Sequence, residues 1–63
     1  MTRKWKVGDE AFRTQGPEVI DVGFVMEVFP VGDIFYNYMR IYWQVLDKDQ
    51  ITSIQDIKTR EQI

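Results

Sequence analysis

The chain has 63 residues, a formal net charge of −2, and neither cysteine nor histidine. Its length allows one domain, residues 1–63, and its composition excludes disulfides, thiolate chemistry, and the side chain that most often serves as a general base or transition-metal ligand. We therefore expect no catalytic residues, metal or cofactor, and a partner chain is the remaining way to stabilise so small a domain.

The first predicted strand covers residues 10–14. Val7-Gly8-Asp9 precedes it as a turn, and Gly16-Pro17 follows it. Proline ends the strand because it lacks an N–H group and restricts the backbone around it. This spacing of strand and turn signals is typical of a small all-β domain.

The second predicted strand covers residues 19–29. Its even positions are apolar, but Val25 and Phe29 place apolar side chains on the odd positions as well. Such a strand is either covered on both faces or bulged part-way along. Gly23 is the expected point of bending, because a strongly curved strand often needs a residue without Cβ.

The third predicted strand, residues 34–46, is the longest. From Met39 onward its odd positions are apolar, whereas its even positions mix aromatic and polar side chains. This alternation indicates one face that is buried and an opposite face that is amphipathic.

Residues 47–49 predict a turn, and residues 50–54 predict a fourth strand. The tail supports two alternatives. One is a helix over residues 53–62, which opens with a capping-box pattern; the other is a 3₁₀ turn at residues 54–57 followed by a closing fifth strand at residues 58–62. We favour the second alternative, because a closing strand removes an exposed sheet edge.

The shared apolar phase of the strands predicts the core. Its expected members are Val7, Val25, Val28, Ile41, Trp43, Val45 and Ile54. Each aromatic ring can bury roughly 150–250 Å², so a core of this size holds only about half of the aromatic side chains. The others are expected on the surface.

The order of these signals resembles the small SH3-like barrels, in the branch of KOW and Tudor-like domains found in many bacterial and phage proteins. The matching segments, in chain order, are Val7-Gly8-Asp9, Gly16-Pro17, Gly23-Phe24-Val25-Met26-Glu27-Val28, Met39-Arg40-Ile41-Tyr42-Trp43, Asp47-Lys48-Asp49 and Asp56-Ile57. They span nearly the whole chain, although residues 34–38 form a longer aromatic insert. The resemblance implies an all-β, five-stranded SH3-like barrel, a fold that unrelated activities share.

Four aromatic residues are expected at a binding surface: Phe35, Tyr36, Tyr38 and Tyr42. Tyrosine combines apolar area with a polar tip and is enriched at recognition sites. The alternatives for this group are packing in the core, a cage for a methylated cation, or an interface with a second copy or another protein. We predict a non-enzymatic interaction module that binds a second copy of itself or a protein partner.

A basic strip near the N-terminus supports an alternative function, nucleic-acid binding by the KOW-like route. It comprises Arg3, Lys4, Trp5, Lys6 and Arg13, which combine cations for phosphate with a ring for base stacking. Residues 14–56 instead carry two cationic and seven anionic side chains, which repel a polyanion. We therefore expect any nucleic-acid binding to be weak and sensitive to salt.

Two further expectations concern location. No apolar stretch approaches the ~20 residues of a membrane span, and no apolar region follows the charged N-terminus as it does in a signal peptide. We expect a cytoplasmic protein without a membrane partner.

Overall fold

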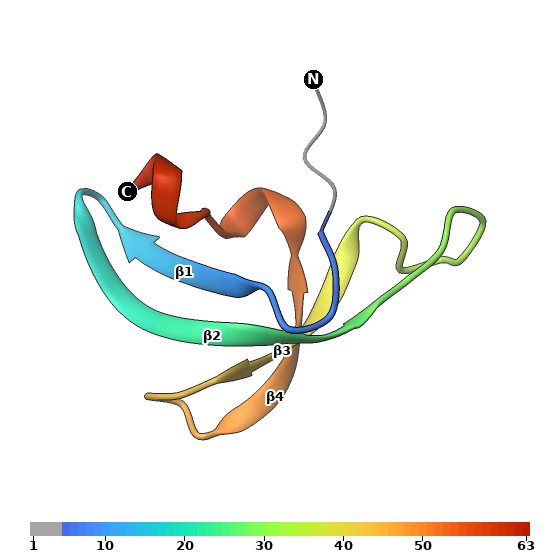
Figure 1. Ribbon diagram of the computed structural model, residues 1–63, viewed down its shortest axis with the longest axis horizontal. Coiled ribbons are helices and arrows are strands. Elements are labelled where there is room, and N and C mark those ends of the chain that lie inside the picture. The colour runs from blue at the N-terminus through green and yellow to red at the C-terminus, as the bar shows by residue number, and fades with distance from the viewer. Residues whose placement is uncertain (1–4) are drawn as a thin grey trace.

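A computed structural model describes residues 5–63 and shows a small all-β domain (Figure 1). Four antiparallel strands form one sheet in the order β1-β2-β3-β4, and two 3₁₀ helices follow the last strand. The elements are β1 (Glu10–Gln15), β2 (Glu18–Val28), β3 (Tyr38–Trp43), β4 (Lys48–Ser53), η1 (Ile54–Asp56) and η2 (Arg60–Gln62).

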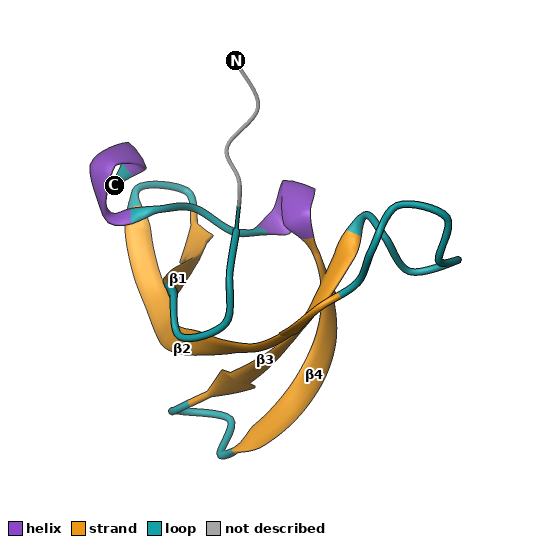
Figure 2. Ribbon diagram, turned by 45° about the vertical axis from the view of Figure 1, so that its right-hand side comes forward, coloured by secondary structure: helices purple, strands orange, loops and turns teal. Residues whose placement is uncertain are grey.

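The sheet is strongly curved, and the segment after β4 returns across its concave side (Figures 1 and 2). The curvature follows the long strand β2, whose pairing shifts register opposite Arg13/Thr14 and again between Val25 and Glu27. A bulge adds a residue to one strand and increases its bend. Of the two alternatives for this strand, the bulge is therefore confirmed.

The core lies between the concave face of the sheet and the segments before β1 and after η1. Its buried members are Trp5, Ala11, Val25, Met39, Ile41, Trp43 and Ile57, and the half-buried Ile54 packs against them. Three predicted core residues, Val25, Ile41 and Trp43, are fully buried. At the centre, the indole Nε1–H of Trp43 donates to the hydroxyl of Thr52 at 3.2 Å.

Three other core predictions are wrong. Val7, Val28 and Val45 are 66%, 37% and 78% exposed, respectively. Val7 lies in a turn that the Asp9 N–H closes onto Lys6 O at 3.1 Å, and Val45 lies in the turn after β3. Val28 is the last residue of β2, beyond the bulge. Strand alternation does not govern residues in turns, so a shared apolar phase there does not lead to burial.

All four predicted strands exist, but the third is much shorter than predicted. It covers Tyr38–Trp43 instead of residues 34–46. Turns occupy residues 31–37 before it and residues 44–47 after it, where Asp47 has a φ of 58° and its N–H closes the turn onto Trp43 O. The ends of the other three strands shift by no more than two residues from the predicted positions.

The predicted fifth strand at residues 58–62 is wrong, and the sheet does not close into a five-stranded barrel. After the predicted 3₁₀ turn, Lys58 forms a single antiparallel bridge with Phe12. The chain then turns into η2 instead of continuing as a strand. The side chain of Gln62 accepts a hydrogen bond from the Thr59 N–H at 2.8 Å, and the Gln62 N–H donates to Thr59 O at 3.0 Å. These local bonds engage backbone N–H and C=O groups that pairing with β1 would otherwise use.

Asp21 is a buried carboxylate that ties the turn after β3 to β2. Only 6% of it is exposed, and it accepts hydrogen bonds from the N–H groups of Val22, Val45 and Leu46 at 2.7, 2.9 and 3.2 Å. Burial by itself raises the pKa of this carboxyl group. The three N–H donors and the charge of Arg13 outweigh burial, so the pKa of Asp21 lies below its ordinary value.

The substitution Asp21→Asn is expected to lower the free energy of unfolding by about 1–3 kcal/mol at neutral pH, because it weakens bonds to buried donors. A carboxyl group with a lowered folded-state pKa stabilises the fold fully above its unfolded pKa of about 3.9, and this contribution is lost as the pH falls through the folded value. Urea unfolding of both proteins should therefore show a stability difference at pH 7 that shrinks in strong acid. A difference that is equal at both pH values would contradict this role for the charge.

Candidate interaction surface

The connection between β2 and β3, residues 29–37, forms an ordered projection; together with Tyr38, the first residue of β3, we call it the aromatic loop. Gly32 has a φ of 101° in its first turn, a conformation that glycine adopts without strain. The Asp33 N–H donates to Pro30 O at 3.0 Å, and the Asp33 carboxylate accepts from the Phe35 N–H at 2.8 Å. A further bond from the Tyr38 N–H to Phe35 O at 2.8 Å leads into β3. The loop is therefore held by hydrogen bonds within itself.

Three rings of the aromatic loop pack in series. The ring centroids of Phe29 and Phe35 are 5.8 Å apart at an interplanar angle of 49°, and those of Phe35 and Tyr38 are 6.1 Å apart at 89°. Tilted and edge-to-face contacts at these distances are the favourable arrangements of aromatic pairs. Because the Phe35 ring contacts both the Phe29 ring and the Tyr38 ring, the three rings form a continuous aromatic row.

The aromatic loop leaves large apolar side chains in solvent. Val31 and Ile34 are 92% and 86% exposed, and Phe35, Tyr36 and Tyr38 are each 40% to 49% exposed. The loop extends away from the sheet on the side opposite the β1–β2 turn (Figure 1). Clustered exposed apolar area of this kind makes the aromatic loop a candidate interaction surface.

Tyr42, the fourth predicted interface residue, is not part of this surface. It lies in β3 opposite Phe24 and Asp49, at the other end of the strand from the aromatic loop. Its hydroxyl donates to the Asp47 carboxylate at 2.5 Å. This hydrogen bond, followed by burial and the nearby carboxylates, raises the pKa of Tyr42 above its ordinary value. Tyr42 thus hydrogen-bonds to the turn after β3, whereas Phe35, Tyr36 and Tyr38 lie together in the aromatic loop.

The structure does not gather the predicted nucleic-acid strip into a surface. Arg3 and Lys4 lie outside the described residues. The Trp5 ring is buried in the core, and the Arg13 guanidinium donates to Gln50 and lies 4.4 Å from the centre of the Trp43 ring. Of the described members of the strip, Lys6 is the one classed as exposed. The described residues therefore add no support for nucleic-acid binding.

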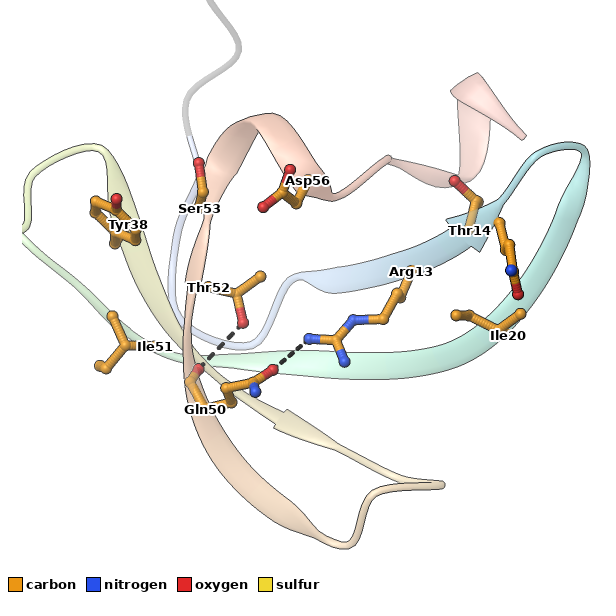
Figure 3. Close-up of a pocket in the computed structure, with 10 residues that line it drawn as sticks. Arg13, Thr14, Ile20, Tyr38, Gln50, Ile51, Thr52, Ser53 and Asp56 are labelled. Carbon is orange, nitrogen blue, oxygen red and sulfur yellow. Dashed lines mark hydrogen bonds between the residues drawn. The ribbon is translucent and has the colours of Figure 1, made fainter.

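A second surface feature is an open groove of about 730 Å³ between β4 and the end of the β1–β2 hairpin (Figure 3). It is lined by Arg13, Thr14, Gln15, Ile20, Tyr38, Gln50, Ile51, Thr52, Ser53 and Asp56. The hydrogen bond from Arg13 to Gln50 spans it from one side to the other. We call this feature the β4 groove.

Sequence reasoning missed Phe29, Val31 and Ile34 as parts of the candidate site. The sequence predicts Phe29 at the end of the second strand and Ile34 at the start of the third. The signal was an apolar side chain at the second position of Pro30-Val31-Gly32-Asp33, a turn motif in which polar residues are more usual. An apolar residue at such a position has no route to the core.

Comparisons with protein-family models, with curated proteins and with solved structures give no significant match to this chain. Among the described residues, no helix has the length and hydropathy of a membrane span. Within residues 5–63, Asp and Glu side chains form no group of three that could hold a metal ion. The geometry of the two surfaces is therefore the basis for a functional proposal.

Proposed function

We propose that this chain is a small protein-interaction module that self-associates through the aromatic loop. The observation that supports the proposal best is the near-complete exposure of Val31 and Ile34 on a loop that its own hydrogen bonds hold in place. An ordered apolar projection has little conformational entropy to lose on binding, so most of the gain from burial is retained.

A second copy of the chain is the partner we propose for the aromatic loop, because dimerisation would stabilise so small a domain. The chain contains no disulfide, and a single core of this size provides little stability. Each Å² of apolar surface removed from water contributes roughly 25 cal/mol, and the aromatic loop carries several side chains that the fold itself leaves in solvent. A symmetric dimer buries two such loops in one interface, and it is the commonest oligomer.

The fold is compatible with self-association but does not by itself indicate it. The antiparallel order β1 to β4, the 3₁₀ turn after β4 and the bridge between Lys58 and Phe12 support the proposal of an open SH3-like domain in which a single bridge stands in place of the last strand. Folds of this size serve many unrelated roles, so the proposal of self-association depends on the aromatic loop and not on the fold.

The mass of the protein in solution tests the proposal, with Ile34→Lys and Val45→Lys as a matched pair. Ile34 and Val45 are both exposed, but Val45 lies in the turn after β3, away from the aromatic loop. We expect wild type and Val45→Lys to form dimers and Ile34→Lys to be monomeric, because a buried unpaired charge is costly. The double substitution of Tyr36 and Tyr38 by serine should weaken association while the domain stays folded.

Two results would overturn self-association. One is a wild-type protein that stays monomeric at high micromolar concentration, in which case the aromatic loop is better explained as a docking surface for a different protein. The other is equal weakening of the dimer by Ile34→Lys and Val45→Lys, which would place the interface elsewhere.

A further inference from the structure

Strand β4 is an open edge of the sheet. It pairs with β3 on one side, and no described strand pairs with its other side (Figure 2). Natural proteins usually protect such edges with proline, a bulge or a charged residue along the strand. β4 has no proline, and its pairing with β3 has no register shift. Its two charged residues, Lys48 and Asp49, lie at its first end, and residues 50–53 are uncharged. The edge at residues 50–53 can therefore accept a further strand.

Two backbone hydrogen bonds show which backbone groups of β4 face the open side. The Gln44 N–H donates to Val22 O at 3.1 Å, so the backbone N–H and C=O groups of Gln44 point toward β2. Because this orientation alternates along the strand, the groups of Tyr42 also point toward β2, and those of the residues on either side of Tyr42 point toward β4. The Ile54 N–H donates to Asn37 O at 3.0 Å, which gives the same phase from the other end of β4. Because orientation alternates along a strand, three residues of β4 direct their N–H and C=O groups outward. These are Asp49, Ile51 and Ser53.

The β4 groove lies along this edge and has walls on both sides. Gln50 to Ser53 form one wall, and Arg13, Thr14 and Ile20 from the β1–β2 hairpin form the other (Figure 3). A single extended segment can lie between the two walls once it displaces the hydrogen bond from Arg13 to Gln50. A second folded copy would bring its own β3 alongside its β4 and thus against the β1–β2 hairpin. The shape of the groove favours a lone peptide strand over a β4–β4 dimer.

The charge in the groove specifies one feature of the peptide. Arg13 is half-buried, and its guanidinium contacts the neutral amide of Gln50 and the Trp43 ring but forms no ion pair among the described residues. The charge of Arg13 helps to lower the pKa of Asp21, but the Asp21 carboxylate is hydrogen-bonded to three backbone N–H groups and not to Arg13. Asp56 lines the groove as well, so a carboxylate on the peptide is favoured beside Arg13 and disfavoured beside Asp56.

We propose that the β4 groove binds an extended peptide that pairs with the outward backbone groups of β4 and places a carboxylate side chain beside Arg13. Main-chain bonds give such a complex its affinity, and the flanking side chains Ile51 and Tyr38 select an apolar residue of the peptide. This binding mode uses the sheet edge and not the tip of the aromatic loop, so it goes beyond the proposed self-association.

The test selects ligands from a display library of random short peptides with the full chain as bait, and then maps the contact by amide hydrogen exchange. We expect bound peptide to slow exchange at Asp49, Ile51 and Ser53, while Gln50 and Thr52, which face β3, are protected with or without peptide. We also expect Arg13→Gln to weaken binding of an acidic peptide about tenfold or more. Arg40→Gln removes the same charge from the Glu27 ion pair outside the groove and should leave binding unchanged.

Three outcomes would overturn this proposal and leave self-association through the aromatic loop untouched. One is the failure of any selected peptide to protect Ile51 and Ser53. Another is equal loss of binding in Arg13→Gln and Arg40→Gln. The third is protection of the same amides on raising the protein concentration without peptide, which would make a second copy the occupant. The exchange pattern is measured on wild-type protein, so it tests peptide pairing with β4 even if the Arg13→Gln variant does not fold.

Discussion

Replacing Trp43 by alanine is expected to lower the free energy of unfolding by about 3–5 kcal/mol, the usual cost of removing a fully buried tryptophan. Trp43 has no exposed surface, and it lies in the core cluster between the concave face of the sheet and Ile57. Its loss also leaves the Thr52 hydroxyl without the indole donor and removes the ring beneath Arg13. A domain of this length has only about 3–9 kcal/mol in total, so much of the variant should be unfolded at room temperature.

Urea unfolding followed by circular dichroism measures this effect, with Trp43→Phe as the matched control. Phenylalanine keeps an aromatic ring in the core but lacks the N–H group that donates to Thr52, so its cost should be clearly smaller than that of alanine. A loss below about 1 kcal/mol for Trp43→Ala would show that the concave side of the sheet is not the core.

Adding one methyl group at Gly23 is expected to destabilise the domain by about 3 kcal/mol or more, at the upper end of the cost of overpacking. A Cβ atom there would lie 2.6 Å from Ile41 Cγ2, 2.7 Å from Trp43 Cε3 and 2.7 Å from the Tyr42 carbonyl oxygen. The last of these atoms is backbone within the β2–β3 pairing, so side-chain rotation alone cannot relieve the contact. Gly23 was predicted as the bend of this strand, and the close approach of β3 is the reason that glycine is required.

Gly8→Ala separates crowding from backbone strain. Gly8 has a φ of 93°, and a Cβ atom there would meet no atom within 4 Å outside its own and adjacent residues. Its substitution therefore tests backbone conformation alone and should cost about 1–2 kcal/mol. Thermal unfolding should therefore rank Gly23→Ala as clearly the less stable of the two variants. The opposite ranking, or a Gly23→Ala protein as stable as wild type, would contradict the observed packing of β2 against β3.

Local alternation was sufficient to predict the four strands and the burial of Ile41 and Trp43. It failed where the chain turns, as at Val45, because a turn does not orient side chains in a two-residue period. It also failed for the tail, where a hydrogen bond from the Thr59 N–H to the Gln62 side-chain oxygen competes with strand pairing. Neither competition is visible in a pattern of apolar residues.

The candidate site was predictable only in part. Aromatic density indicated Phe35, Tyr36 and Tyr38, and these three do lie together in the aromatic loop. Tyr42 shares their residue type, but it is directed to Asp47 by a turn whose conformation depends on distant groups. The hydrogen bonds from the Val45 and Leu46 N–H groups to the Asp21 carboxylate join residues far apart in sequence, and no local sequence signal identifies them.

A dilution series of two-dimensional amide NMR spectra tests the central proposal, self-association through the aromatic loop, most directly. Each backbone amide gives its own signal, so the series reports both whether the protein associates and which residues the second copy contacts. The proposal predicts concentration-dependent shifts between the low micromolar and millimolar ranges that centre on residues 31–36 and are small at Val45. Spectra that do not change over this range, or shifts confined to residues outside the aromatic loop, would contradict it.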